Sequence, residues 1–353
     1  MIYNNIIAND MEDIYSRDKR WNELNNKVVM ITGAYGMLAS YMVAFLYFLK
    51  KQKGINVYLV AVVKNEDKFF EKLSFLKKCS WVKGIQSSLD TAICLEENID
   101  YIIHAASLAS PQHYSVRPID VLVPNTIGTY HLLNMAAEKK VKSFLLFSTG
   151  DIYGAVDNKV VITESDFGVM DTLEIHNCYS ESKRMAETLC KAFYVQRKVP
   201  VKLARIWHTY APTMDVDNDP RVFASFVRNI LNDENIVMNS DGQGKRSFCY
   251  ITDAVAGYFK ILFEGVEGEA YNVCNSDQFV SIAELAERLV QLVPEKRLRV
   301  ERRARKENQV YSENILARDA VPDNRKLRNL GWQAKIDIVE GFSRVIAYYD
   351  MEQ

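Results

Sequence analysis

Short apolar runs alternate along the chain with longer segments that have helical periodicity. Residues that are apolar at consecutive positions are typical of strands buried on both faces of a sheet. Such runs lie in the segments KVVMITG at Lys27, NVYLVAVV at Asn56, DYIIHAAS at Asp100, SFLLFSTG at Ser143 and VKLARIW at Val201. Because strand and helix take turns, the pattern predicts an α/β fold with a doubly wound parallel sheet over residues 27–207.

The regular alternation weakens after Trp207, where proline and glycine residues mark loops. Helices are expected at 221–233, 251–265 and 281–293, and Ser281 is a suitable N-cap for the last of them. We therefore expect residues 208–353 to form a smaller C-terminal α/β lobe that covers the substrate, with some crossing of the chain between the two lobes.

Residues 1–26 are polar and precede the first strand of the pattern. Their sequence is compatible with one helix that has Asn9 as its N-cap and acidic residues in its first turn. We interpret this segment as an added N-terminal element and predict no role for it.

The stretch between Lys27 and Lys50 contains 22 residues without a charge. A helix of that length would measure ~33 Å, about the thickness of the hydrocarbon core of a bilayer. Gly33 and Gly36 interrupt the stretch, however, and residues 37–49 alone would cover only ~20 Å. Since the chain has no second apolar span, we do not expect it to cross a membrane.

The same stretch contains the loop TGAYGMLA, in which Gly33 and Gly36 are followed by Ala39. Small residues at this spacing let a strand turn sharply into a helix, and they let backbone N–H groups approach a pyrophosphate. The apolar strand before the loop and the apolar helix after it strengthen the interpretation as a dinucleotide site.

The end of the second strand indicates which dinucleotide fits. NAD-binding sites usually have an acidic residue there, which binds the hydroxyl groups of the adenosine ribose. This chain has Lys64 at that place. A cation suits a 2′-phosphate, so NADP(H) is favoured and NAD remains possible.

Tyr179 and Lys183 in the segment YSESK are four residues apart, which places both side chains on one face of a helix. A phenol with a pKa of about 10 exchanges protons poorly at neutral pH. A neighbouring ammonium group favours the phenolate and so lowers that pKa. We therefore expect this pair to transfer a proton while a hydride moves to or from an alcohol carbon.

The motifs TGAYGMLA, HAAS, FSTGDIYG and YSESK, in this order, resemble the extended short-chain dehydrogenase/reductase family of nucleotide-sugar epimerases, dehydratases, decarboxylases and reductases. The resemblance covers residues 27–332, and the substrate-lobe motifs are most similar to those of UDP-glucuronate decarboxylases. It implies a Rossmann fold in which Tyr179 is the acid/base and Lys183 holds the nicotinamide ribose. Ser148 and Thr149 would then bind the C4 oxygen of the sugar, and His104 would be structural.

The resemblance also implies the residues that bind each ligand. The cofactor would be held by Gly33, Tyr35, Gly36, Met37, Leu38, Lys64, Ala105, Ala106 and Ser107, together with Tyr179 and Lys183. The nucleotide-sugar diphosphate would be held by Ser110, His208, Arg221, Val222, Arg246 and Arg318. Arginine is suited to this task because its guanidinium group bonds phosphate through two N–H groups at once.

The sequence departs from the pattern of the family in two segments. Dehydratases have Asp and then Glu after the threonine, because an acid must protonate the leaving hydroxyl at C6 while a base removes the proton at C5. This chain has Gly150 and Asp151, so 4,6-dehydration is disfavoured. A decarboxylase would have Ser and then Glu there, and Asp151, which we include among the catalytic candidates, is a shorter carboxylate. His208 likewise replaces the usual Asn, either as a substrate ligand or as a packed loop residue.

These departures favour an NADPH-dependent 4-ketoreductase that acts on a nucleotide-linked 4-keto-6-deoxyhexose, for the sugars of a surface polysaccharide such as an O-antigen in lipopolysaccharide or a capsule. The alternative is a UDP-glucuronate decarboxylase or a 4-epimerase with tightly bound NAD. A catalytically inactive nucleotide-sugar-binding protein is the hypothesis from another class, and the intact Tyr179 and Lys183 argue against it.

Composition excludes several other classes. The 353 residues include 44 basic and 45 acidic side chains, so nothing suggests a nucleic-acid partner. The six cysteines form no C-x-x-C pair, so we expect neither a metal site nor a redox motif. Without a recognisable secretion signal, a cytoplasmic location is expected. By analogy with the family, a homodimer would pair the helical segment at 118–140 with the one at 179–196.

Overall fold

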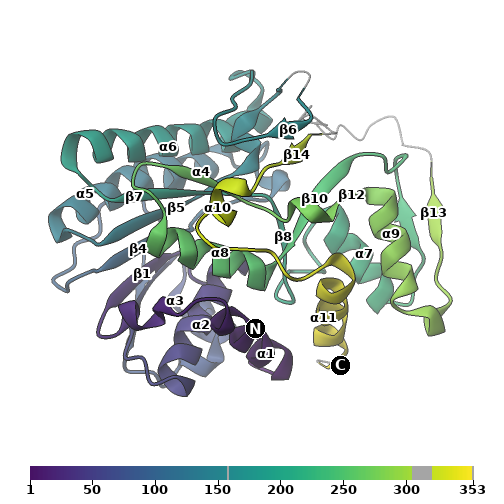
Figure 1. The fold of residues 1–353 in the computed structure, drawn as a ribbon, viewed down its shortest axis with the longest axis horizontal. Helices are drawn as coiled ribbons and strands as arrows, with labels where there is room; N and C mark the ends of the chain where they lie inside the picture. Colours follow the sequence, from purple (N-terminus) through teal and green to yellow (C-terminus); the bar gives the residue numbers. More distant parts are fainter. Residues whose placement is uncertain (157–158, 304–319, 352–353) are drawn as a thin grey trace.

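The computed structural model describes residues 1–156, 159–303 and 320–351. Its larger part is built on a seven-stranded sheet in the order β11-β7-β5-β4-β1-β2-β3, in which every neighbouring pair is parallel (Figure 1). The strands are β1 (Val28–Thr32), β2 (Tyr58–Val63), β3 (Val82–Gln86), β4 (Tyr101–His104), β5 (Ser143–Thr149), β7 (Val201–Ile206) and β11 (Ala270–Val273).

This sheet confirms the expected doubly wound α/β fold. The apolar runs of the sequence became β1, β2, β4, β5 and β7, whereas the two edge strands β3 and β11 were not expected. Strand β3 is only partly buried, and β11 has just four residues, so neither produces a long apolar run.

Helices cover both faces of the sheet (Figure 1). One face packs against α2 and α8, and the opposite face against α5 and α6. The helices of this part are α2 (Met37–Gln52), α3 (Glu66–Lys72), α4 (Pro118–Val123), α5 (Thr129–Lys139), α6 (Cys178–Arg197) and α8 (Ile251–Glu264), and a π-helical turn at Pro124–Gly128 joins α4 to α5.

The uncharged stretch near the N-terminus forms β1, the glycine turn and the first part of α2. Most of the side chains of α2 are buried, because the helix lies between the sheet, α1 and α8. Burial inside the protein thus explains why the stretch lacks charge. Among the described residues, no helix has both the length and the apolar character needed to cross a bilayer.

The N-terminal segment differs from the expectation. Helix α1 spans Asn5–Ser16, and its N-cap is Asn4, whose side chain accepts a hydrogen bond from Ile7 N at 3.1 Å. Asn9 was therefore the wrong cap, because it lies inside the helix. The helix starts earlier since its buried face already begins at Ile7 and continues through Met11 and Ile14.

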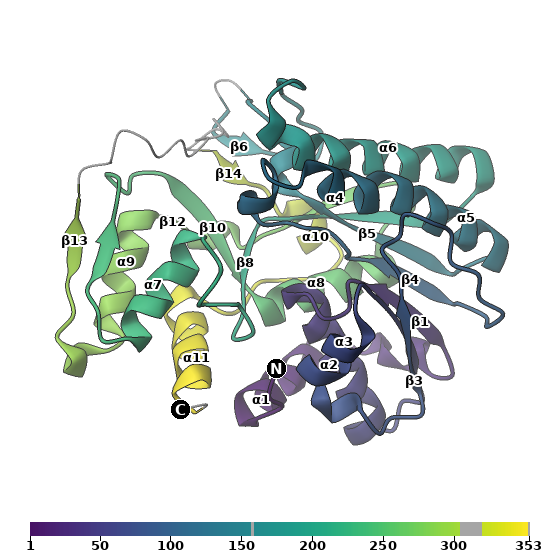
Figure 2. The same ribbon diagram turned by 180° about the vertical axis from the view of Figure 1, so that it is seen from behind.

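The smaller lobe contains a three-stranded sheet in the order β12-β10-β8 and a separate β9-β13 pair (Figures 1 and 2). The strands are β8 (His208–Tyr210), β9 (Ile236–Met238), β10 (Lys245–Tyr250), β12 (Phe279–Ser281) and β13 (Val300–Arg302). Helices α7 (Val222–Leu231), α9 (Ile282–Gln291) and α11 (Ile338–Asp350) pack around them.

The three helices expected after Trp207 are confirmed as α7, α8 and α9. Ser281 caps α9 as expected, since its Oγ accepts a hydrogen bond from Glu284 N at 3.1 Å and Glu284 Oε2 accepts one from Ser281 N at 2.8 Å.

The chain crosses between the two parts several times. After β10 it returns to the large sheet through α8 and β11, and β14 (Val321–Pro322) later pairs with β6 (Val161–Ile162). A short helix, α10 (Arg325–Arg328), follows β14. Among the described residues, 3₁₀ turns lie at Arg20–Leu24, Ser74–Leu76, Pro111–His113, Gly150–Tyr153, Ile175–Asn177, Ser276–Gln278 and Pro294–Lys296.

Candidate active site

The glycine loop forms a tight turn between β1 and α2. Gly33 has a φ of +64°, and a Cβ at this position would come within 2.8 Å of the Ala106 Cα. Gly36 is the N-cap of α2 and has no side chain to bond the free N–H groups of the first helical turn. The loop therefore offers the close backbone approach and the helix N-terminus that a pyrophosphate requires.

The other residues expected at the cofactor surround this loop. Tyr35, Met37, Leu38, Ala105, Ala106 and Ser107 are all partly buried. The hydroxyl oxygens of Ser107 and Ser110 are buried without a hydrogen-bond partner among the described residues, so they are free to bond a ligand. Lys64 is exposed directly after β2, where the next residue, Asn65, caps α3.

His104 is structural, as expected. Its Nδ1 lies 2.8 Å from the hydroxyl of Thr32, and its Nε2 lies 3.1 Å from both the Pro124 carbonyl oxygen and the Thr129 hydroxyl. Burial lowers the pKa of His104 to about 3. The ring is thus uncharged, and its hydrogen bonds connect β4 to β1 and to the start of α5.

Tyr179 lies in the first turn of α6, beside Thr149 and Asp151 at the end of β5. Burial raises the pKa of the phenol first, and the carboxylate of Asp151 raises it further. A hydrogen bond with Thr149 and the charge of Arg221 act in the opposite direction. The lowered pKa that we expected beside Lys183 is therefore wrong for this structure, because the pKa of Tyr179 is raised and burial is the largest cause.

Lys183 follows one turn later on α6 and is 2% exposed. Its Nζ donates a hydrogen bond to the Phe147 carbonyl oxygen at 2.7 Å and lies 5.9 Å from the centre of the Tyr179 ring. Burial lowers its pKa to about 7, although Glu187 acts to raise it. The structure thus places the tyrosine and the lysine side by side at the carboxyl end of β5, as the spacing predicted.

The two adjacent hydroxyl groups at the end of β5 have different partners. Thr149 bonds Tyr179 and also accepts a hydrogen bond from Asp151 N at 3.2 Å. Ser148 instead donates to Glu187 Oε1 at 2.6 Å. Because the Ser148 hydroxyl is already engaged with a carboxylate, we retain Thr149 alone as the candidate ligand of the sugar oxygen.

Trp207 covers Gly150, a contact that the sequence did not indicate. A Cβ on Gly150 would lie 2.8 Å from two atoms of the indole ring, Cδ2 and Cε2. The indole is held in place because its Nε1 donates to Asn272 Oδ1 at 3.1 Å. The aromatic ring thus leaves no room for a side chain at position 150. Asp151 is the carboxylate next to Tyr179, and burial raises its pKa.

Tyr114 is a second residue that the sequence did not indicate. Its ring stacks on the Tyr179 ring with a centroid distance of 5.1 Å and an interplanar angle of 7°. It follows the 3₁₀ turn at Pro111–His113, and no spacing rule connects that loop to the helix of Tyr179.

Three of the expected substrate residues converge from different elements. His208 begins β8, Arg246 lies on the neighbouring β10, and Arg221 precedes α7. The pKa of His208 is lowered to about 3, first by burial and then by the charges of Arg246 and Arg221. Its Nδ1 is buried without a partner among the described residues. A neutral imidazole near two guanidinium groups is suited to bind an anion.

This cationic site adjoins the tyrosine. Burial raises the pKa of both Asp151 and Tyr179, and the charge of Arg246 opposes this rise at Asp151 while that of Arg221 opposes it at Tyr179. Val222 is the first residue of α7 and is partly buried. Arg318 lies outside the described residues, so its expected contact with the substrate stays a prediction.

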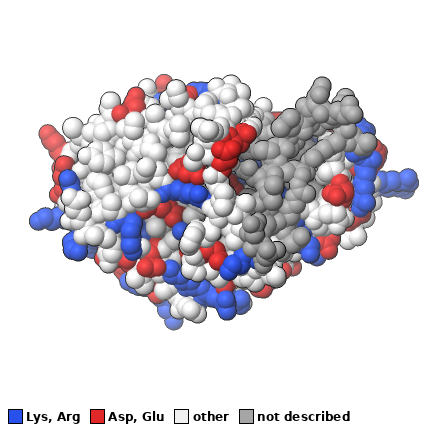
Figure 3. All heavy atoms as spheres, turned by 90° about the horizontal axis from the view of Figure 1, so that it is seen from above, with Lys and Arg blue, Asp and Glu red and all other residues white. Residues whose placement is uncertain are grey.

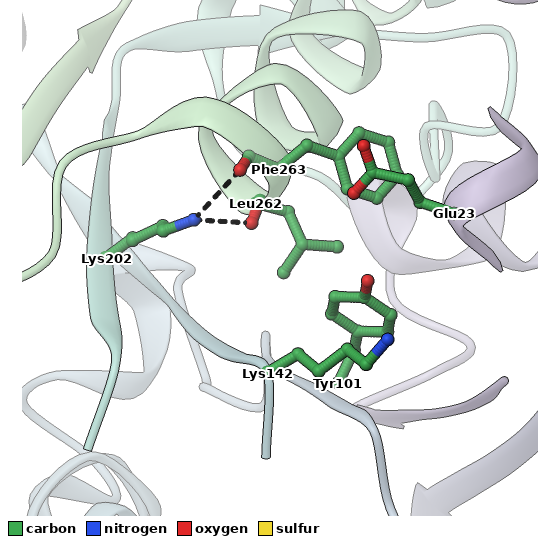
Figure 4. A pocket seen from close by; sticks show the side chains of 6 residues that line it. All are labelled: Glu23, Tyr101, Lys142, Lys202, Leu262 and Phe263. Carbon is green, nitrogen blue, oxygen red and sulfur yellow. Dashed lines mark hydrogen bonds between the residues drawn. The ribbon is translucent and has the colours of Figure 1, made fainter. Parts of the chain in front are cut away.

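Two cavities lie elsewhere. One, of about 200 Å³, is lined by Tyr101, Lys142 and Lys202 at the amino ends of β4, β5 and β7, together with Glu23, Leu262 and Phe263 (Figure 4). There the Nζ of Lys202 donates to the carbonyl oxygens of Leu262 and Phe263 at 2.7 and 3.4 Å and so caps the end of α8. The other cavity, of about 570 Å³, lies beside the edge strand β11.

Comparison with known proteins identifies the family of the chain. The model of the NAD dependent epimerase/dehydratase family matches residues 29–274. UDP-glucuronic acid decarboxylase 6 of Arabidopsis thaliana is 31% identical over 323 residues, which cover 90% of this chain and 87% of the relative. UDP-glucuronic acid decarboxylase 1 of Xenopus tropicalis is 31% identical over 347 residues, which cover 96% of this chain and 76% of the relative.

Solved structures share the fold at lower identity. An epimerase from Methanothermobacter thermautotrophicus is 18% identical with a TM-score of 0.80, covering 100% of this chain and 97% of its own. The UDP-glucuronic acid 4-epimerase of Bacillus cereus, in complex with UDP-glucuronic acid and NAD, is 18% identical with a TM-score of 0.73. The match covers 92% of this chain and 100% of the epimerase chain. From the glycine turn to β11, this chain belongs to the NAD-dependent epimerase/dehydratase family of nucleotide-sugar enzymes.

Proposed function

We propose that this chain transfers a hydride at C4 of a nucleotide-linked sugar. The observation that carries the proposal is the grouping of Tyr179, Thr149 and Lys183 beside the cationic site formed by Arg221 and Arg246. Tyr179 moves the proton of the C4 hydroxyl, and Thr149 bonds the same oxygen. The two arginines hold the diphosphate.

The cofactor belongs at the glycine loop. The close approach of Gly33 to Ala106 and the free N-terminus of α2 fit its pyrophosphate, and Lys183 fits its nicotinamide ribose. A bound nicotinamide dinucleotide supplies the acceptor and the donor of the hydride.

For the overall reaction we favour the redox-neutral decarboxylation of a UDP-uronate. The similarity to UDP-glucuronic acid decarboxylases extends over 90% of the chain. When C4 of such a sugar is a ketone, the bond from C5 to the carboxylate breaks, the C4 carbonyl takes up its electrons, carbon dioxide leaves and C5 then gains a proton. This step needs no acid at Gly150, and a 4-epimerase would use the same hydride transfer.

A second candidate is the NADPH-dependent reduction of a nucleotide-linked 4-keto-6-deoxyhexose for a surface polysaccharide. Lys64 is the specific observation that favours it, because an exposed cation directly after β2 suits the 2′-phosphate of NADP. Tyr179 would then donate its proton to the oxygen formed at C4.

The state of the cofactor separates these candidates. Purified protein is denatured and the released dinucleotide is measured, while the folded protein is offered UDP-glucuronate or a nucleotide-linked 4-keto-6-deoxyhexose with NADPH. Retained NAD with conversion of UDP-glucuronate supports the first reaction, and NADPH consumption supports the second. Tyr179→Phe is the control: turnover at the wild-type rate in this variant would contradict any role of Tyr179 in proton transfer.

We further propose that two copies associate through α5 and α6. The face of the molecule that carries these helices is broadly uncharged (Figure 3). Tyr130 on α5 and Met185 and Val195 on α6 expose 47%, 51% and 60% of their surface there. Apolar side chains of this size on adjacent helices are typical of a helix-to-helix interface.

A further inference from the structure

A partly buried ion pair, at the wall of the cavity beside β11, connects α6 to β7 behind the catalytic pair. Arg205 Nε donates to Glu187 Oε1 at 3.1 Å, and Arg205 Nη2 donates to Glu187 Oε2 at 2.8 Å. Each side chain is only 12% exposed. Two parallel bonds of this kind hold the carboxylate in one orientation.

Other polar groups complete this network. Ser148 Oγ donates to Glu187 Oε1, and Arg205 Nη1 donates to the Tyr153 hydroxyl at 3.1 Å and to the Glu164 carbonyl oxygen at 2.8 Å. Removing two charges from water costs several kcal/mol per ion. Replacing such a pair by apolar residues of similar volume therefore often leaves the stability of a protein unchanged or higher. Stability alone therefore gives no reason for a charged pair at this place.

The geometry of α6 suggests what the pair does. Glu187 lies four residues after Lys183, so both side chains lie on the same face of the helix. The Lys183 ammonium group is buried and donates to a single backbone oxygen, that of Phe147. A buried ammonium group needs a negative counter-charge to remain protonated.

The titratable groups around Lys183 come from three elements. Helix α6 contributes Tyr179, Glu187 and Cys190, β4 contributes His104, and β7 contributes Arg205 behind Glu187. Burial leaves His104 neutral, and burial also raises the pKa of the Cys190 thiol, which keeps it protonated. Glu187 makes the largest electrostatic contribution that favours the charged form of Lys183.

We infer that Glu187 is a positioning residue, which Arg205 and Ser148 hold in place and which keeps Lys183 as an ammonium group beside Tyr179. The inference rests on the proposed hydride transfer, because that reaction requires a charged lysine at the tyrosine. It adds a residue to the working site that makes no contact with Tyr179 itself.

The test replaces Glu187 by glutamine, which has the same shape but no charge. Since the pKa of Lys183 is already lowered to about 7, losing the negative charge lowers it further. The alkaline limb of the profile of kcat/KM against pH should therefore move to lower pH by about one unit. In parallel, NMR titration of the Lys183 ε-carbon, assigned by its loss in Lys183→Met, should show the same shift.

Glu181→Gln is the matched control. It removes one negative charge from the same helix, but Glu181 pairs with Arg184 at 3.3 Å and both side chains are 29% exposed. We expect no shift of the Lys183 titration in this variant.

Glu187→Asp provides an independent variant. It keeps a negative charge on the same turn of α6, so the Lys183 titration should stay close to its wild-type position. A merely structural role would lower activity in Glu187→Gln without moving this titration. An unchanged Lys183 titration in folded Glu187→Gln, or a shift in Glu187→Asp as large as that in Glu187→Gln, would overturn the inference. The NMR titration needs no turnover, so it also decides the matter if no nucleotide sugar is converted.

Discussion

The two hydroxyl groups at the end of β5 show how single residues of the same chemistry acquire different tasks. Thr149 faces Tyr179, whereas Ser148 bonds the carboxylate of Glu187. We expect Thr149→Val to lower kcat by about 10²-fold, because the sugar oxygen loses a hydrogen bond during proton transfer. Steady-state kinetics with whichever of the two candidate substrates is converted checks this effect.

Ser148→Ala is the companion variant at the neighbouring position. It removes a bond to Glu187 and none to Tyr179, so kcat should fall less than about 10-fold. If Ser148→Ala instead reduced kcat as strongly as Thr149→Val, our assignment of the sugar-binding hydroxyl to Thr149 alone would be wrong.

The Trp207 ring requires a residue without a side chain at position 150. A Cβ there would overlap the Trp207 ring, so Gly150→Ala should lower the free energy of unfolding by about 1–3 kcal/mol. Combining it with Trp207→Leu should remove most of this loss, because the smaller side chain leaves room. Urea unfolding of the single and double variants measures both effects.

Gly244→Ala is a suitable control for this prediction. The nearest atom to a Cβ at Gly244 is Arg246 Nη1, at 3.7 Å, which is an ordinary contact. A loss of stability in Gly244→Ala equal to that in Gly150→Ala would show that the effect does not come from Trp207.

Among the elements, α1 connects the two parts of the molecule through its polar side chains. Its Asp10 accepts hydrogen bonds from the hydroxyls of Tyr41 on α2, at 2.9 Å, and Tyr250 on β10, at 2.7 Å, and from Arg344 Nη1 on α11, also at 2.7 Å. A second link joins Arg17 to Asp253, whose carboxylate also accepts from the backbone after α10. The N-terminal helix thus ties the cofactor part to the smaller lobe.

The buried carboxylate of Asp10 makes this link sensitive to pH. Burial raises its pKa from 3.8 to about 6. A raised pKa means that the stabilisation is complete below pH 3.8 and is lost as the pH rises through about 6. The free energy of unfolding of the wild type, relative to that of Asp10→Asn, should therefore decrease as the pH rises from 3.8 to about 6. Denaturant unfolding at a series of pH values measures it, and a difference that does not change with pH would contradict this prediction.

The whole molecule presents the uncharged face over α5 and α6. Met185→Glu should convert the proposed dimer to a monomer, because a buried charge without a partner opposes association. Light scattering after size-exclusion chromatography gives the mass in solution. Val266→Glu is the control, since Val266 is 59% exposed on the loop after α8 and should leave the mass unchanged. A wild-type protein that is already monomeric would refute the proposed dimer.

Some features of the fold and site were predictable because their signals are local. Consecutive apolar residues predicted the central strands, glycine spacing predicted the turn at Gly33, and spacing of four residues placed Tyr179 and Lys183 on one helix face. Each of these depends on residues within one strand or one to two helical turns, where backbone geometry dictates which side chains are neighbours.

The sequence by itself thus determined the fold class, the family resemblance and the candidate catalytic pair, Tyr179 and Lys183. Only the tertiary structure decided that Trp207 covers Gly150, that Arg205 holds Glu187 and that His208 lies near Arg221 and Arg246. It also decided that the polar-looking N-terminus buries one face of α1. These contacts join segments far apart in the chain, and they depend on strand order and helix packing, which no short pattern of residues encodes.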